Sequence, residues 1–238
     1  MKTNSNEVIV KLSQDIFSIQ MKWSLWYMPI VLLIYLGSML FFPEVRETNI
    51  GLMNFYYEPS KVFMLVIGII FPLAMLSHFV KYGITRKDYM ISSAIASVGI
   101  AFSLMIIAAI LSAIIQLFEM FSGAFDVSFI ESQSNWFLPI VVLSIILICY
   151  NIAGWMIAMG FYRFGAWGGM GFIAIALVFI ALIDILWERE LSVLSTTYLP
   201  FSIPNLSLGW SIIGTAVLIA VGLIIIHRIM ERVRIKLE

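Results

Sequence analysis

Long apolar stretches alternate with short polar ones along the whole chain. Six stretches lack Lys and Arg and are about the length of a membrane crossing: residues 23–42, 62–80, 90–118, 138–160, 168–187 and 208–226. A transmembrane helix needs about 20 apolar residues to cross about 30 Å of hydrocarbon. Helix is the expected conformation, because backbone polar groups in lipid have to bond within their own segment. The pattern predicts an all-α polytopic membrane protein with six transmembrane helices.

The first 22 residues show a different, amphipathic periodicity. Apolar positions recur at helical spacing, at Val8, Leu12, Ile16, Ile19 and Trp23. Polar positions recur on another face, at Glu7, Lys11, Asp15, Ser18 and Lys22. This spacing predicts an amphipathic interfacial helix over 1–22, followed by a single six-span domain over 23–238. The helix is either a general membrane anchor or an elbow that transmits motion into the first span.

The distribution of basic residues predicts the orientation. With six spans, one side of the membrane carries eleven of the fourteen Lys and Arg residues, which are Lys2, Lys11, Lys22, Lys81, Arg86, Lys87, Arg163, Arg228, Arg232, Arg234 and Lys236. Only Arg46, Lys61 and Arg189 fall on the other side. By the positive-inside rule, both termini are expected in the cytoplasm.

Composition changes the picture mainly by exclusion. The chain of 238 residues is 62% hydrophobic and 12% charged, against about 25% charged in a soluble domain. Its 14 basic and 14 acidic residues cancel, which does not favour nucleic-acid binding. The single cysteine, Cys149, lies in an apolar stretch and indicates no disulfide framework. The phosphate-binding pattern GxxxxGK[ST] is absent, so any ATP is expected to be hydrolysed by another chain.

The first cytoplasmic loop, residues 81–89, is short and highly charged. Gly83 suits the end of one helix, because it tolerates a left-handed conformation. Thr85, followed three residues later by Asp88, has the form of a capping box that begins the next helix. The helix that begins here is expected to extend from Arg86 to Phe118, which at 1.5 Å per residue is about 50 Å. Either this helix protrudes into the cytoplasm, or its first turns form a separate short helix.

Few residues within the spans offer chemistry. Pro72, with Gly68 one turn earlier, is expected to kink the second span, either as a hinge or as a packing device. Asn151 and Asp184 are candidate intramembrane polar sites. No catalytic motif, catalytic residue or metal-ligand cluster is evident, so no enzymatic activity and no cofactor are expected in this chain. The apolar loop 188–207 is predicted either to re-enter the outer leaflet or to lie in the interface.

This layout resembles the membrane (permease) subunit of type-2 ABC exporters, in particular the small bacterial members. The stretch Gly83-Ile84-Thr85-Arg86-Lys87-Asp88-Tyr89 is similar to their Gly-x-(Ser/Thr)-Arg-Lys-(Asp/Glu)-(Tyr/Phe) corner. The resemblance covers the whole chain in layout and these seven residues as a local motif. One sublineage exports or confers immunity to cytolytic peptides and bacteriocins, and this chain could belong there.

The resemblance implies a bacterial plasma-membrane complex of two permease subunits, identical or paralogous, and two copies of a separate ABC ATPase that holds ATP and Mg²⁺. The ATPase would dock on the corner, with polar contacts to Arg86, Lys87 and Asp88 and packing against Tyr89. Gly83 and Thr85 would shape this coupling corner. The cargo would be an amphipathic or hydrophobic peptide, antibiotic or lipid. The alternative hypothesis is a stand-alone secondary transporter or channel that uses Asp184 or Asn151, and an intramembrane enzyme is a third.

Overall fold

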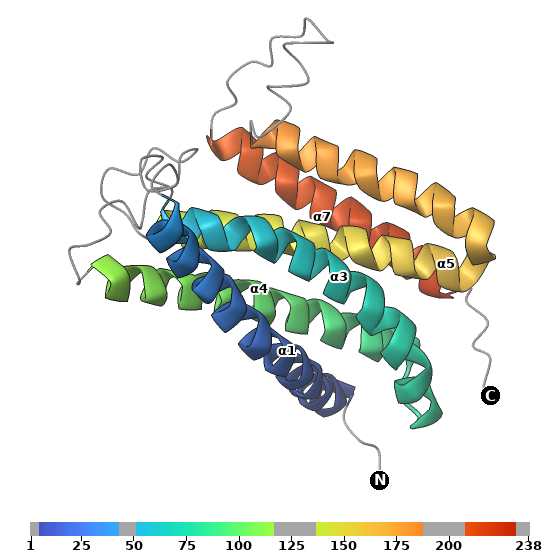
Figure 1. Cartoon of the computed structure of the whole chain (residues 1–238). Helices are drawn as coiled ribbons and strands as arrows, with labels where there is room; N and C mark the ends of the chain where they lie inside the picture. The colour runs from blue at the N-terminus through green and yellow to red at the C-terminus, as the bar shows by residue number, and fades with distance from the viewer. Residues whose placement is uncertain (1–4, 43–50, 117–136, 188–207, 232–238) are drawn as a thin grey trace, which may run out of the picture. The chain divides into compact units, whose positions relative to one another are not determined.

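The computed structural model describes residues 5–42, 51–116, 137–187 and 208–231. These residues form the helices α1 (Ser5–Phe41), α3 (Leu52–Lys81), α4 (Arg86–Gln116), α5 (Phe137–Leu186) and α7 (Leu208–Glu231), without a strand among them (Figure 1). All five helices are long and apolar enough to cross a membrane. The expectation of an all-α fold whose helices are long and apolar enough to span a membrane is therefore confirmed for the described residues. The loop 188–207 and the basic residues near the C-terminus, from Arg232 onward, lie outside the described residues.

Helix α5 is a hairpin of two helical arms. A straight helix of its 50 residues would be about 75 Å long. At Gly165 the backbone leaves the helical region, with φ 69° and ψ −162°, a conformation that favours glycine. The two arms then fold back on each other, as the yellow and orange segments of Figure 1 show. The Tyr150 hydroxyl donates a hydrogen bond of 3.2 Å to Asp184 Oδ1, although 34 residues separate the two. The apolar stretches 138–160 and 168–187 thus occupy separate arms.

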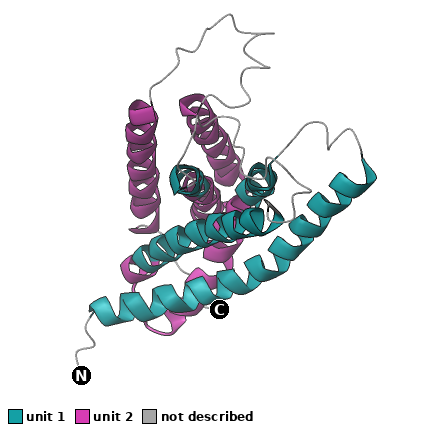
Figure 2. Cartoon of the chain, turned by 90° about the vertical axis from the view of Figure 1, so that its left-hand side faces the viewer, with its two compact units in different colours: residues 1–63, 90–147 teal, residues 64–89, 148–238 magenta. Residues whose placement is uncertain are grey.

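The chain divides into two compact units (Figure 2). Unit 1 comprises residues 1–63 and 90–147, and unit 2 comprises residues 64–89 and 148–238. Each unit is therefore assembled from segments that are distant in the sequence, and helices α3, α4 and α5 each contribute to both.

In unit 1, the first half of α1 packs along α4. The Ser92 hydroxyl donates to the Ile9 carbonyl at 3.0 Å, and a Cβ added at Gly99 would lie 3.0 Å from the Phe17 ring. Since residue 9 lies by 92 and residue 17 by 99, the two helices run in the same direction here. The predicted polar face is exposed at Glu7, Lys11, Asp15, Ser18 and Lys22, and the predicted apolar face is buried at Leu12 and Ile16. On the same predicted apolar face, Val8 and Ile19 are half-buried and Trp23 is 39% exposed, while the polar residues Ser13 and Gln20 are buried.

The helix boundaries differ from the predicted ones at two places. Helix α1 continues without a break from Ser5 through Pro29 to Phe41, so the expected division at residue 22 is not a structural boundary. The reason is that one stripe of buried residues, spaced three or four apart, extends along the helix from Leu12 to Met39. Helix α3 begins at Leu52, ten residues before the apolar stretch 62–80.

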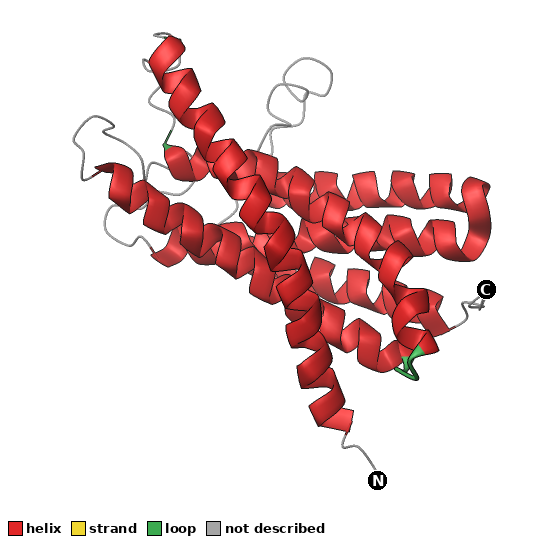
Figure 3. Ribbon diagram, turned by 60° about the horizontal axis from the view of Figure 1, so that its bottom comes forward, coloured by secondary structure: helices red, strands yellow, loops and turns green. Residues whose placement is uncertain are grey.

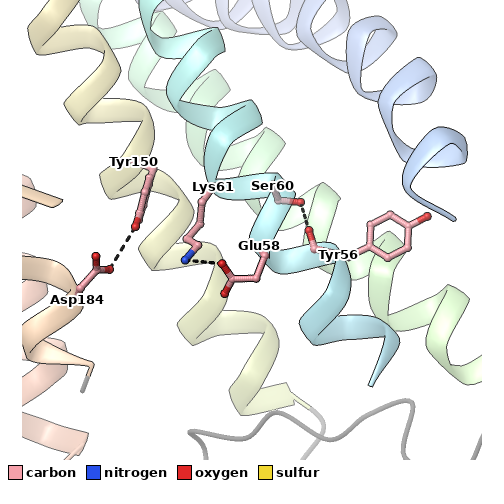
Figure 4. Close-up of polar contacts among 6 residues, drawn as sticks. All are labelled: Tyr56, Glu58, Ser60, Lys61, Tyr150 and Asp184. Carbon is pink, nitrogen blue, oxygen red and sulfur yellow. Dashed lines mark hydrogen bonds and ion pairs between the residues drawn. The ribbon is translucent and has the colours of Figure 1, made fainter. Parts of the chain in front are cut away.

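The early start of α3 is explained by aromatic packing on α1 within unit 1. The Tyr56 hydroxyl donates to the Met28 carbonyl at 2.7 Å, and the Tyr27 hydroxyl lies 3.1 Å from Ser60 Oγ. The rings of Tyr27 and Phe63 stack with centroids 4.5 Å apart. The charged residues of this segment are accommodated by pairing, because Lys61 Nζ lies 2.7 Å from Glu58 Oε2 (Figure 4).

In unit 2, glycines allow α3, α5 and α7 to approach closely. A Cβ at Gly68 of α3 would collide with the Asn151 carbonyl oxygen of α5, and a Cβ at Gly154 would collide with the Leu65 carbonyl oxygen. Helix α7 meets both arms of α5 at Gly222, where a Cβ would touch Ile152 and Phe179. Small residues permit such close helix contacts, which stabilise helix packing in membranes.

Candidate functional site

The corner between α3 and α4 is a compact turn whose backbone bonds are satisfied locally (Figure 3). Gly83 has φ +83°, the left-handed conformation expected from the sequence. The Ile84 N–H donates to the Phe79 carbonyl at 3.2 Å, and the Gly83 N–H donates to the Val80 carbonyl at 3.0 Å. This pair of hydrogen bonds is the Schellman motif, which satisfies carbonyls that a helix end otherwise leaves unpaired. Helix α3 therefore ends in a defined geometry.

Helix α4 begins directly after this motif with Thr85 as its N-cap residue, which forms the Asp88 N–H bond of the predicted capping box. The Asp88 N–H donates to Thr85 Oγ1 at 3.1 Å, and the Thr85 hydroxyl donates to Asp88 Oδ2 at 2.8 Å. Only Ile84 separates the glycine that ends one helix from the residue that caps the next. Helix α4 then continues unbroken from Arg86 to Gln116, so the alternative of a separate short helix in its first turns is wrong.

The side chains of the corner divide into exposed and buried ones. Tyr82 is 75% exposed, and Thr85 and Lys87 are exposed, while Asp88 is half-buried. Tyr89 is fully buried, its hydroxyl lies 3.5 Å from the Phe71 carbonyl, and its ring centroid lies 5.9 Å from that of Phe79. The expectation that Tyr89 packs against a docked chain is therefore wrong, because its ring is part of the interior between α3 and α4.

Arg86 contacts the end of another helix. Its Nη1 donates to the carbonyls of Met230 and Glu231, at 3.5 and 3.4 Å. These carbonyls belong to the last turn of α7, where helix geometry leaves acceptors unpaired and the helix dipole favours a cation. The sequence suggested a contact with a partner, whereas the structure places this guanidinium against the same chain.

The turn of α5 lies at the same end of unit 2 as the corner. Leu186 packs by Gly214 and Phe179 by Gly222, so the second arm of α5 runs antiparallel to α7. The end of α7 at Glu231 therefore lies at the end of that arm nearest Gly165. Within the described part of unit 2, this end carries the basic residues Lys81, Arg86, Lys87, Arg163 and Arg228. The opposite end, within the same described residues, carries Asp184 and no Lys or Arg.

Two predicted sites from different stretches meet where α3 crosses α5. The backbone of Asn151 lies against Gly68, and the Asn151 amide donates to the Met64 carbonyl at 3.0 Å. Asn151 is 3% exposed, so its amide links two buried helices. Helix α3 continues through Pro72, one turn beyond Gly68. Proline lacks the N–H that would bond the Gly68 carbonyl, which leaves the helix weaker at this crossing.

Asp184 has a separate environment. Its carboxylate accepts the Tyr150 hydroxyl bond between the two arms of α5 (Figure 4). One turn further, the Trp187 indole N–H donates to Thr215 Oγ1 at 3.0 Å, which links α5 to α7. Asp184 and Asn151 therefore both take part in contacts between helices. Cys149 is buried, and the described residues contain no group of three or more His, Cys, Asp or Glu side chains that could hold a metal ion.

Three partners in these contacts were not identified from the sequence. They are the α7 carbonyls that Arg86 reaches, the glycine at 154 that meets Gly68, and the tyrosine at 150 that bonds Asp184. Gly154 lies three residues after Asn151, and this spacing is the one sequence feature that could have indicated that Gly154 takes part in the same helix contact. Comparisons with protein-family models, with curated proteins and with solved structures found no match, so the functional argument rests on the geometry.

Proposed function

We propose that this chain is the permease subunit of an ATP-driven exporter of the type-2 ABC class. The observation that carries the proposal is the doubly capped corner between Gly83 and Asp88. An ATP-driven permease without its own phosphate-binding loop depends on another chain for ATP hydrolysis. The surface that transmits the movement of that chain needs to be rigid. A Schellman motif followed at once by a threonine N-cap gives the corner such rigidity, since both helix ends are held by local hydrogen bonds.

The proposed topology has six crossings, with one crossing for each arm of α5 and both termini in the cytoplasm of a bacterial cell. Two observations support it. In unit 1, α1 and α4 run in the same direction along their contact, as the first and third spans would. In unit 2, the described basic residues gather at the end that holds the corner. The positive-inside rule assigns that end to the cytoplasm.

In the proposed mechanism, two permease subunits, identical or paralogous, enclose a pathway for an amphipathic peptide, antibiotic or lipid. Each subunit binds one separate ABC ATPase, which carries ATP and Mg²⁺. Closure of the ATPases displaces the corner, and the helices on both sides of the corner move with it. Lys87 and Tyr82 are the contact residues that this proposal favours, because both are exposed beside the capped turn.

A stand-alone secondary transporter that uses Asp184 or Asn151 has less support. A coupling residue needs to exchange a proton or an ion, whereas the Asn151 amide is engaged by the Met64 carbonyl and the Asp184 carboxylate by Tyr150. That hypothesis predicts cargo movement by the purified chain in liposomes without nucleotide.

The test is whether an ABC ATPase is encoded beside this chain and co-purifies with it. We expect a stable complex, and we expect Lys87→Glu to weaken ATPase capture at least tenfold, because a charge reversal at a docking contact replaces attraction with repulsion. Lys22→Glu is the matched control, since Lys22 is also an exposed lysine and lies thirteen residues beyond Ile9, the α1 residue that contacts the start of α4. Equal capture by both variants would refute the docking assignment, and transport by the chain alone would favour the secondary transporter.

A further inference from the structure

Arg86 joins two segments that are 144 residues apart in the sequence. Its half-buried guanidinium reaches the carbonyls of Met230 and Glu231 at 3.5 and 3.4 Å. A guanidinium presents five N–H donors in a planar fork, so one arginine can serve two neighbouring carbonyls. The adjacent Lys87 is exposed. The first residue of α4 and the last turn of α7 are therefore connected by one side chain.

Helix α7 is in turn tied to α5 along its length. Gly222 meets Ile152 and Phe179, which lie on different arms of α5. Near the other end, Thr215 accepts the Trp187 indole bond at 3.0 Å. A displacement of the corner would thus pass through Arg86 to α7 and then to both arms of α5, as well as directly to α3 and α4.

The contact also places the last turn of α7 beside the exposed part of the corner. Arg228 and Glu231 are exposed there, and Glu231 Oε1 lies 3.2 Å from His227 Nε2. At the corner itself, Lys81, Tyr82 and Lys87 are exposed, while Asp88 is half-buried and bonded by Thr85. The exposed charges of the combined surface are therefore mainly positive, which fits an acidic face on a cytosolic protein partner.

We infer that the docking surface for the cytosolic partner is composite, formed by the corner and the last turn of α7, and that Arg86 holds its two halves together. Arg86 is then a positioning residue, whereas Lys87 and Arg228 contact the partner. The identity of the partner as an ABC ATPase rests on the proposed function, but the role of Arg86 within the chain does not.

The role of Arg86 is tested on the full-length chain alone, in lipid nanodiscs, by amide hydrogen exchange. We expect Arg86→Gln to raise exchange of the amides of residues 226–231 about two- to fivefold, which is the size of a lost cation at a helix C-terminus. Lys87→Gln is the matched control, because it removes the neighbouring charge without touching α7, and we expect no change. Arg86→Lys should restore part of the protection. Equal exchange in Arg86→Gln and Lys87→Gln would overturn the assignment.

The composite surface is tested by capture of the ABC ATPase that the proposed function requires. We expect Arg228→Glu to weaken capture as Lys87→Glu does, by about tenfold, and Arg163→Glu to leave it within twofold. Arg163 lies at the same end of unit 2, but its guanidinium stacks on Phe164 of the α5 turn, 4.7 Å from the ring centroid. Equal effects at 163 and 228 would overturn the composite surface in favour of general charge attraction. If the wild-type chain captures no ATPase, the proposed function fails, while the exchange experiment still decides the role of Arg86.

Discussion

The two units solve the problem of burying backbone and polar groups in different ways. Among the described residues, unit 2 brings helices together at glycines, and its buried Asn151 and Thr215 are hydrogen-bonded across helices. Unit 1 buries many more polar side chains, namely Ser13, Gln20, Ser24, Ser60, Lys61, Ser92, Ser93, Ser97, Ser112 and Ser144. Three buried atoms there, Gln20 Oε1, Ser93 Oγ and Ser112 Oγ, have no hydrogen-bond partner, against Trp155 Nε1 in unit 2.

This difference indicates that the helix packing of unit 2 tolerates fewer substitutions than that of unit 1. Where two helix backbones are in contact, an added side-chain atom has no space. An unpaired buried polar group, by contrast, lowers the stability of the folded state, and replacing it with an apolar side chain removes that cost. Unit 2 also carries the capped corner. In the proposed mechanism, a tightly packed unit would receive the displacement, because a loosely satisfied interior would absorb it.

The largest effect is expected at the α3–α5 crossing of unit 2. Gly154→Ala adds a Cβ against the backbone carbonyl of Leu65, which cannot rotate away, so we expect a loss of about 3 kcal/mol or more of stability and poor yield. Gly171→Ala is the matched control on the second arm of α5, where a Cβ meets nothing within 4 Å. There the better helix propensity of alanine should be neutral or stabilise by up to about 1 kcal/mol.

The measurement is thermal or denaturant unfolding of both variants in the same detergent. Similar stabilities for Gly154→Ala and Gly171→Ala would mean that the two helices do not touch at Gly154. The contrast between the units would then lose its main support.

A smaller loss is expected when the polar link at the same crossing is removed. Asn151→Leu deletes the amide that donates to the Met64 carbonyl, and interhelical hydrogen bonds in membranes contribute about 0.6 to 2 kcal/mol. We expect a destabilisation of that size in the same unfolding assay. Unchanged stability together with abolished transport would instead show that Asn151 acts on cargo, as the secondary-transporter hypothesis requires.

The local features of unit 2 were predictable and the long-range ones were not. The left-handed Gly83 and the N-cap bond from the Asp88 N–H to Thr85 follow from residues that are close together in the sequence. The Asn151–Met64 bond and the Arg86–Met230 contact span 87 and 144 residues, and no helical periodicity specifies such partners. The apolar stretches were likewise evident from hydropathy.

The helix ends in unit 1 were harder to predict, because tertiary packing decides them. Residues 52–61 contain charges and a proline, yet aromatic contacts of Tyr56 and nearby residues with α1 extend α3 over them. The continuity of α1 past residue 22 follows in the same way from a buried stripe that packs on neighbouring helices. The burial of Tyr89 depends on its contact with Phe79 of α3, and the sequence of the corner alone does not predict that contact.

The corner offers a prediction of intermediate size. Thr85→Ala removes the hydroxyl that accepts the Asp88 N–H, and loss of an N-cap residue costs about 1 kcal/mol. We expect that loss in unfolding, with faster amide exchange in the first turn of α4, and recovery in Thr85→Ser, which retains the hydroxyl. A variant that lacks the hydroxyl and still shows wild-type exchange at Asp88 and Tyr89 would argue against a rigid corner.

The smallest effect, and the one of opposite sign, is expected at Gln20 in unit 1. Gln20 is 3% exposed and its Oε1 has no partner, so the side chain carries a desolvation cost without a compensating bond. Gln20→Leu keeps a similar volume and removes the unpaired oxygen, and we expect unchanged stability or a gain of up to about 1 kcal/mol in the same assay used for Asn151→Leu. The two substitutions replace a buried amide by the same apolar side chain, one in each unit, and only Asn151→Leu should lower stability. If Gln20→Leu destabilises the protein as much as Asn151→Leu does, the glutamine oxygen must have a hydrogen-bond partner, such as a bound water. The interior of unit 1 would then be as fully hydrogen-bonded as that of unit 2.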